Sequence, residues 1–433
     1  MKPFRRRSFL GTLATASAIP IMPAFLKPDA SSDWIAPYKS ALTKQSGTTS
    51  LAYDEEFWYR IKTMYAASPG LLNLNNGGVS PQPIIVQEAF ERYNRMCNEA
   101  PSYYMWRILD QGREPLRQRL AEFAGTSPDE VSICRNASEA LETAIFGMRL
   151  QKGDKVVVSR LDYPNMMNAW KQRELRDGII LKWVELDLPT MSNEDIVDAY
   201  SKQITSDVKV VHITHLINWN GHIVPSKRIA DLAHAVGAKT VVDGAHSFAH
   251  IQYKIPDLGA DYFGTSLHKW LCAPFGSGLL YVKKEHIGQT YPLLANDQPE
   301  STDIRKFESL GTRSFAIEQA IGQALDFQYS IGNDVKQERL QFLKQYWTEA
   351  VRHHPKIHIN TDMRPDRSCA IAIVLIDGHT PAELGEMLQN QYKIHTTSID
   401  YSNVHGVRIT PHVYTVKADL DRLISALLKI ADS

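Results

Sequence analysis

Short apolar runs alternate with helical stretches through the middle third of the chain. The runs are apolar at nearly every position, a pattern typical of strands that are covered on both faces. They span residues 155–159, 180–185, 208–214, 240–242, 262–265 and 278–282. Helical periodicity between them indicates helices at 165–176, 193–204 and 226–236. The alternation predicts an α/β fold in which helices cover a mainly parallel sheet.

The folded part of the chain is predicted to form two domains, because 433 residues exceed the usual size of one. Residues 51–315, which begin with an N-terminal segment at 51–72, would form the large domain, and 316–433 a small α+β domain. In the small domain the pattern predicts a long helical region to residue 354, a strand at 369–376 and helices at 381–391 and 417–430.

Residues 1–30 have the pattern of an export signal. Basic residues precede a weakly apolar stretch without acids, and Arg6-Arg7-Ser8-Phe9-Leu10 fits the twin-arginine form, whose route carries folded proteins. The alternative is an uncleaved membrane anchor, but Pro20 and Pro23 interrupt the ~20 apolar residues that a spanning helix needs. We expect a polar linker at 31–50, a periplasmic location and no membrane anchor after cleavage.

Composition narrows the class of ligand. The 48 basic residues equal the 48 acidic ones and 43% of residues are hydrophobic, which argues against disorder and against a nucleic-acid partner. The four cysteines lie far apart without a C-x-x-C spacing, so no zinc or other metal site is indicated. The sequence does not decide whether two of these cysteines form a disulfide bond. We expect a small-molecule ligand.

Two residues carry the first chemical hypothesis. Asp243 ends a β-branched run, and Lys269 follows 26 positions later. A carboxylate can keep a pyridine nitrogen protonated and an amine can hold an aldehyde as a Schiff base, which are the two groups that pyridoxal phosphate (PLP) needs. Alone, Asp243 could equally be a helix N-cap and Lys269 a solvated charge. Leu267, Trp270 and Leu271 favour desolvation of the amine, which lowers its pKa.

Polar residues near other predicted strand ends offer groups for the rest of such a cofactor. Ser138 lies at the start of an apolar helix whose free N–H groups would bind phosphate, although Asn136 or Ser138 as an ordinary N-cap explains the pattern as well. Ser266 and His268 offer a hydroxyl and an imidazole for the same phosphate. Tyr163 follows the strand at 155–159 and could stack on a flat ring, but most tyrosines are packing residues.

Two further positions keep open alternatives. Asn218 could bind the phenolic oxygen of the cofactor, and Asn220 is an alternative for that role. Either residue could instead serve only the turn before Gly221. Arg408 interrupts an apolar run, where it would either pair with a substrate carboxylate or be an exposed charge on an edge strand.

Three motifs together resemble the class V aminotransferase family, and within it isopenicillin N epimerase and its relatives. They are Asn-Ala-Ser-Glu-Ala at 136–140, Val-Asp-Gly-Ala-His at 242–246 and Leu-His-Lys-Trp-Leu-Cys-Ala-Pro at 267–274. The likeness spans residues 74–431. It implies a fold-type I PLP enzyme with a large cofactor domain and a small C-terminal domain, assembled as a homodimer with a shared active site.

The resemblance assigns roles around the cofactor ring. Lys269 would be the Schiff-base lysine and Asp243 the partner of the pyridinium nitrogen. His246 and Asn218 would neighbour the phenolic oxygen, and Tyr163 matches the ring-stacking position, where many relatives carry a histidine.

It also assigns the phosphate and substrate contacts. The phosphate would be held by Ala137, Ser138, Ser266 and His268. Thr312 matches a segment that reaches the phosphate of the partner subunit. Asn75 matches the substrate loop and Arg408 the clamp for the substrate carboxylate.

The reaction type stays open within the family. Cysteine desulfurases need a catalytic loop cysteine between the Thr312 and Arg408 positions, where this chain has only Cys369 in a strand-like run, so that chemistry is disfavoured. We expect Lys269 to take the α-proton of an amino-acid substrate. Epimerase or racemase ranks first, with Tyr163 or His246 as candidate second proton donor. Lyase and aminotransferase follow, and a non-catalytic PLP-binding or scaffold relative is the alternative outside enzymes.

Overall fold

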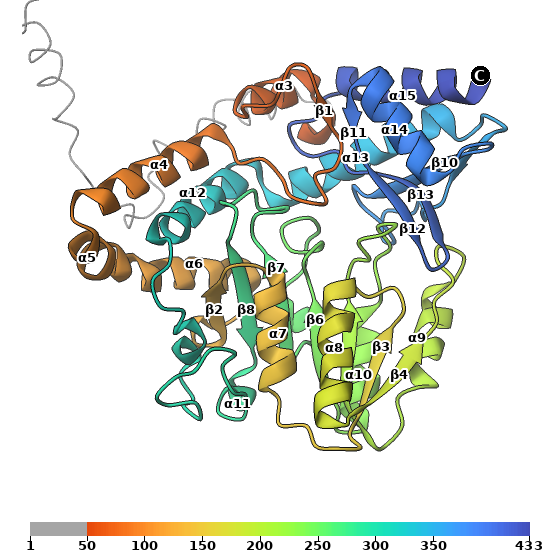
Figure 1. The fold of residues 1–433 in the computed structure, drawn as a ribbon. Coiled ribbons are helices and arrows are strands. Elements are labelled where there is room, and N and C mark those ends of the chain that lie inside the picture. Colours follow the sequence, from red (N-terminus) through yellow and green to blue (C-terminus); the bar gives the residue numbers. More distant parts are fainter. Residues whose placement is uncertain (1–49) are drawn as a thin grey trace, which may run out of the picture. The chain divides into compact units, whose positions relative to one another are not determined.

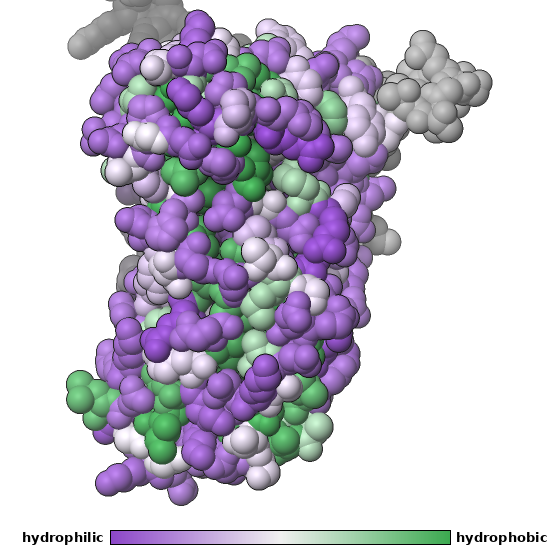
Figure 2. All heavy atoms as spheres, turned by 90° about the vertical axis from the view of Figure 1, so that its right-hand side faces the viewer, coloured by the Kyte–Doolittle hydropathy of each residue, from purple (hydrophilic) through white to green (hydrophobic). Residues whose placement is uncertain are grey.

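The computed structural model describes residues 50–433. The predicted signal at 1–30 and all of the predicted linker except Ser50 lie outside the described residues. Within the described range, no helix has both the length and the apolar character needed to cross a membrane. The face shown in Figure 2 is mostly hydrophilic, with apolar residues in small groups and recesses between polar ones.

A seven-stranded sheet forms the centre of the structure (Figure 1), in the order β2-β8-β7-β6-β5-β3-β4. Neighbouring strands run parallel except β8, which is antiparallel to both of its neighbours. In this order the strands are Val131–Cys134, Gly278–Val282, Tyr262–Ser266, Lys239–Asp243, Val208–Thr214, Lys155–Ser159 and Ile180–Val184. The predicted α/β fold with a mainly parallel sheet is confirmed.

Helices cover both faces of this sheet. Alternate residues of β3 enter different hydrophobic clusters: Val156 and Val158 pack with α7 (Ala137–Gly147) and α8 (Pro164–Asp177), whereas Val157 packs in the cluster that includes α9 (Asn193–Ser201) and α10 (Ser226–Ala235). Burial on both faces is why these strands are apolar at every position rather than at alternate ones.

A second, antiparallel sheet has the order β12-β13-β10-β9. These strands are Thr397–Tyr401, Val404–Ile409, Ala372–Ile376 and Ile357–Ile359, and the helices α14 and α15 are Pro381–Tyr392 and Lys417–Asp432. The strand predicted at 369–376 begins only at Ala372. The helical region predicted from 316 to 354 is two helices, α12 (Phe315–Ile331) and α13 (Asn333–Val351), because Gly332 between them has φ +93°.

The remaining helices lie toward the start of the chain. They are α3 (Glu55–Thr63), α4 (Ile84–Glu99), α5 (Pro101–Tyr103) and α6 (Arg113–Ala124), with the short α11 (Lys284–Ile287) after β8. A two-residue parallel pairing joins β1 (Leu72–Asn73) to β11 (Ile394–His395). The boundary predicted at 315/316 falls at the start of α12, which packs on α4 and α6, so the division into two domains stays a prediction.

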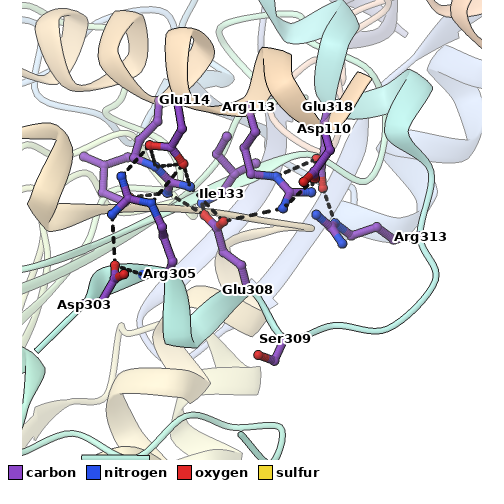
Figure 3. A network of polar contacts seen from close by, with 12 residues as sticks. Asp110, Arg113, Glu114, Ile133, Asp303, Arg305, Glu308, Ser309, Arg313 and Glu318 are labelled. Carbon is purple, nitrogen blue, oxygen red and sulfur yellow. Dashed lines mark hydrogen bonds and ion pairs between the residues drawn. The ribbon is translucent and has the colours of Figure 1, made fainter. Parts of the chain in front are cut away.

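A buried ion network holds the segment that leads into α12 (Figure 3). Glu308 accepts hydrogen bonds from the Arg117 guanidinium, at 2.6 and 2.8 Å, and from the backbone N–H of Ile133 at 2.7 Å. Glu318 pairs with Arg113 at 2.8 Å and also with Arg313. Because these contacts bracket residues 309–312, the network fixes both ends of that exposed segment.

Removing one charge from this network is expected to be costly. Arg117 is fully buried, so Glu308→Ala would leave it without its main counter-charge and lower the free energy of unfolding by about 3–5 kcal/mol. Glu300→Ala, which breaks the exposed Arg149–Glu300 pair, is the matched control and should cost about 0–1 kcal/mol. Urea unfolding measures both, and equal small losses would contradict the role given to the network.

Candidate active site

A cavity of about 450 Å³ lies at the carboxyl ends of the parallel strands, where open α/β sheets bind their ligands. It brings together residues from β5, β6 and β7, from the start of α7 and from the second sheet. The predicted site residues that line it are Ala137, Ser138, Tyr163, Asn218, Asp243, His246, Ser266, His268, Lys269 and Arg408. Asn75 and Thr312 do not line it.

Lys269 places an amine in this cavity. Its Nζ lies 3.0 Å from Nε2 of the buried His246. Removal of water from around the amine lowers the pKa of Lys269 to about 8, with Arg408 adding to the effect and Asp243 opposing it. The same burial, with the Lys269 charge, keeps the pKa of His246 well below its usual value. The neutral imidazole therefore accepts a hydrogen bond from the lysine amine.

The loop that carries Lys269 is fixed by the residue that follows it. The buried Trp270 ring stacks on His250, with ring centroids 3.6 Å apart, and on His412 at 5.3 Å. The Lys336 ammonium donates to the Trp270 carbonyl oxygen. This packing leaves the lysine backbone little freedom, which suits a group that must hold a fixed position over a cofactor.

Asp243 ends β6 as a buried carboxylate without an ion pair among the described residues. Oδ1 accepts the Ala245 N–H at 2.9 Å, and burial raises the pKa of Asp243 although Lys269 opposes this. A buried charge needs a hydrogen-bonded partner. The side chain faces the cavity, so the protonated nitrogen of a pyridine ring would meet that need.

The start of α7 forms one end of the cavity, where the phosphate was predicted. Asn136 caps the helix by accepting the Glu139 N–H at 2.9 Å, and Ser266 Oγ accepts the Ala137 N–H at 2.9 Å. The N-cap role that Ser138 could have had thus belongs to Asn136, and the Ser138 hydroxyl stays at the cavity wall. A helix N-terminus flanked by hydroxyls binds phosphate well.

His268 is held beside this end of the cavity. Its Nδ1 lies 3.0 Å from the Ser277 carbonyl oxygen, and burial lowers its pKa. The backbone of β8 comes close here, because a Cβ on Gly278 would lie 2.6 Å from the Asn136 nitrogen. Glycine at this position therefore lets the strand support the helix start.

Arg408 is not an exposed edge-strand charge. Its strand, β13, lies between β12 and β10, and the residue is 6% exposed. Nη1 donates to the Asn218 carbonyl oxygen at 2.8 Å and Nη2 to Asn75 Oδ1 at 3.0 Å. Asn75 thus reaches the site by orienting Arg408.

The structure also shows where the remaining candidate residues lie. Asn218 lines the cavity, whereas Asn220 is fully buried and its Oδ1 accepts the His222 N–H at 3.2 Å, so the structure favours Asn218 over its rival. Tyr163 is 39% exposed and lines the cavity rather than packing in the core. Thr312 is exposed on the segment before α12, away from this chain's own cavity.

Sequence reasoning missed two contributors. Asp162, directly before Tyr163, is fully buried and accepts hydrogen bonds from Thr214 Oγ1 at 2.7 Å and from the Ser159 N–H at 2.6 Å. Burial, with the nearby Asp243 charge, raises the pKa of Asp162 to about 7. The other is Trp219, which lines the cavity next to Asn218. An acid three residues after the end of a buried strand was a signal for Asp162, but no local sequence feature marked Trp219.

The groups present fit PLP. The cavity offers an amine for an aldehyde, a carboxylate for a ring nitrogen and a helix N-terminus with hydroxyls for a phosphate. Two more polar atoms of lining side chains, Nδ1 of His246 and Oδ1 of Asn218, have no partner among the described residues. The roles of the individual side chains stay predictions.

Known proteins are similar to this chain in sequence and in fold. Residues 74–423 match the sequence model of the family Aminotransferase class-V. Isopenicillin N epimerase of Amycolatopsis lactamdurans is 25% identical over 86% of this chain and 98% of the epimerase. A probable cysteine desulfurase of Halalkalibacterium halodurans is 31% identical over 64% of this chain and 71% of that protein. The apo structure of a cysteine desulfurase from Thermococcus onnurineus matches with a TM-score of 0.76 at 20% identity, covering 86% of this chain and 98% of that one.

The lowered pKa of Lys269 predicts how the apoprotein captures PLP. Only the neutral amine attacks an aldehyde, so the capture rate should rise with pH and reach half of its maximum near pH 8, where the Lys269 ammonium loses its proton. Stopped-flow absorbance on apoprotein mixed with PLP measures this rate, with Lys269→Ala as the control for other lysines. A midpoint near pH 10.5, the ordinary lysine value, would contradict the assigned environment.

Proposed function

The chain belongs to the class V aminotransferase family of PLP-dependent enzymes, and we propose that it acts at the α-carbon of an amino acid as an epimerase or racemase of the isopenicillin N epimerase type. The observation that carries the proposal is the pairing of Lys269, with its lowered pKa, and buried Asp243 in one cavity that also holds Arg408. PLP, when bound, draws electrons from the substrate's α-carbon into its ring and so acidifies the α-proton.

The chain's own residues supply the remaining chemistry. Asp243 holds a proton on the ring nitrogen, and Lys269 Nζ, neutral above about pH 8, takes the α-proton as general base. His246 accepts a hydrogen bond from that amine at 3.0 Å and so aims it. Each group is positioned before substrate arrives.

Arg408 defines the substrate's carboxylate position. Burial lowers its pKa to about 10, so it stays charged at neutral pH, and both terminal nitrogens are already oriented by Asn218 and Asn75. A planar guanidinium held in this way binds a carboxylate in two-pronged fashion. With Lys269 in the same cavity, this arrangement selects α-amino acids or their derivatives.

Cysteine chemistry has little support here, although cysteine desulfurases share the fold. The chain's four cysteines are buried, and none lines the cavity. Cys369, the one in the interval where desulfurases carry their catalytic cysteine, is fully buried, and burial raises its pKa to about 12. A reactive thiolate needs exposure and a lowered pKa.

Inversion at the α-carbon needs a second proton donor on the face opposite the lysine. His246 is hydrogen-bonded to Lys269 and so lies on the lysine's side, which leaves Tyr163 as the better of the two candidates. Tyr163 is partly exposed at the cavity, so solvent can restore its proton.

Deuterium exchange separates these roles. In D2O, the PLP-loaded enzyme should replace the α-proton of its substrate and produce both enantiomers, measured by proton NMR and chiral chromatography. Lys269→Ala should abolish both, whereas Tyr163→Phe should keep exchange but slow inversion about 10²–10⁴-fold, the usual size of a general-acid contribution. Exchange with a keto-acid product and retained side chain would indicate an aminotransferase, and loss of a side-chain substituent together with release of the α-amino group as ammonia would indicate a lyase. Equal loss of exchange and inversion in Tyr163→Phe would contradict its role.

The proposal includes a homodimer and export. Thr312 is exposed on a segment whose two ends are held by the Glu308 and Glu318 ion pairs, which supports the proposal that it reaches the phosphate site of the partner subunit. Export to the periplasm rests on Arg6-Arg7 within residues 1–30, outside the described residues, and cell fractionation tests it.

Subunit mixing tests the shared site. Thr312→Asp would place a negative charge against the partner's phosphate, so this variant and Lys269→Ala should each bind PLP weakly or without the lysine-dependent absorption band. A heterodimer of the two would contain one complete site and should recover up to about half of the band. No recovery on mixing, with heterodimer formation confirmed by tagged subunits, would contradict a shared site.

A further inference from the structure

A fixed aromatic wall lines the cavity beside Arg408. Trp219 follows Asn218, whose carbonyl oxygen holds the Arg408 guanidinium, and it lines the cavity together with Thr397 and Ile399 of β12. Thr397 is the register partner of Arg408 across the β12–β13 pair. The wall, defined as Trp219, Thr397 and Ile399, is therefore next to the predicted carboxylate clamp.

Two contacts hold Trp219 in place. Its ring stacks on Tyr401 with centroids 4.4 Å apart and planes 20° apart, and its indole N–H donates to the Leu161 carbonyl oxygen at 2.9 Å. The polar atom of the ring is thereby satisfied, and the rest is an apolar plane. Rigid aromatic planes bind apolar groups at low cost in conformational entropy.

The hairpin that carries Tyr401 is itself anchored. Asn403, at the turn between β12 and β13, donates from Nδ2 to Asp187 Oδ1 at 3.0 Å and to the Leu186 carbonyl oxygen at 3.2 Å. Figure 1 shows the two strands extending from the second sheet toward the region of β4 and α9. The wall is thus held by the loops that follow β3 and β4 as well as by β12.

The charged side chains near the wall already have a partner or a role in the proposed function. Among the described lining residues, the acid and the two strong bases are Asp243, Lys269 and Arg408, which the proposed function assigns to the ring nitrogen, the α-carbon and the substrate carboxylate. Asp162 and Arg160 are the charges near Tyr401. Asp162 is buried and accepts hydrogen bonds from Thr214 and Ser159, and Arg160 pairs with Glu185 at 3.0 Å and lies over the Trp183 ring. No described group at the wall is left to pair with a charged side chain.

We propose that this wall is the subsite for the substrate's side chain and that it selects amino acids whose side chain is uncharged and apolar or aromatic. The inference rests on the proposed function, because it takes Arg408 as the carboxylate clamp. A charged side chain would lose its hydration at Trp219 and Ile399 without gaining a partner. An aromatic or branched apolar one would pack on the fixed indole.

Amino-acid titrations of the PLP-loaded enzyme test this, with the visible spectrum as readout. Both enantiomers of phenylalanine, alanine and glutamate are compared. Phenylalanine is expected to bind about tenfold more tightly than alanine, and glutamate more weakly than both. Trp219→Ala should weaken phenylalanine binding about tenfold and leave alanine binding unchanged, while Trp219→Phe should keep most of the preference.

The matched control is Trp183→Ala, which removes an indole from β4 outside the cavity and should leave the preference unchanged. A gain-of-function variant covers the case in which Trp219→Ala does not fold: Thr397→Arg adds a cation beside Arg408 and should tighten glutamate binding about tenfold.

Two results would overturn this inference and leave the proposed function standing. One is that alanine or glutamate binds as tightly as phenylalanine or more tightly. The other is that Trp219→Ala and Trp183→Ala change the preference for phenylalanine alike. If the enzyme keeps its PLP band but responds to no amino acid, the proposed function fails as well, so the two failures are distinguishable.

Discussion

The structure depends on placing a lysine amine and a carboxylate in one poorly hydrated cavity. Asp243 is buried without an ion pair among the described residues, and Lys269 has lost enough of its water for its pKa to fall to about 8. Both conditions cost free energy in the absence of a ligand. A pyridine ring that carries an aldehyde relieves both at once, which is why the cavity suits PLP better than a ligand without ionisable groups.

The fold makes this placement possible. Parallel strands end at one edge, so Thr214 and Asp243, partners in register across β5 and β6, lie side by side there, with Ser266 at the end of the next strand. The second sheet contributes a guanidinium group to this cavity. From it, Arg408 reaches the same cavity and is held by Asn75 near the start of the described chain and by Asn218 after β5.

Local sequence patterns predicted the features that depend on residues close together in the chain. Strands buried on both faces were recognisable because every position of Val156–Val158 is apolar, and Asp243 and Lys269 stood in motifs specific enough to name a cofactor. Contacts between residues far apart in the chain could not be predicted from the sequence. That Arg408 lies on an inner strand depends on β12 and β10, and the Trp219 wall depends on Tyr401 on a distant hairpin. The break at Gly332 was missed because both sides of it are helical.

The most direct test of the account is chemical trapping of the cofactor on its lysine. Borohydride reduction of the PLP-loaded protein, followed by proteolysis and mass spectrometry, identifies the amine that holds the aldehyde. The account predicts a pyridoxyl group on the peptide that contains Lys269. Labelling of Lys336 or Lys344, whose pKa values burial also lowers to about 8, or of no lysine at all, would contradict it.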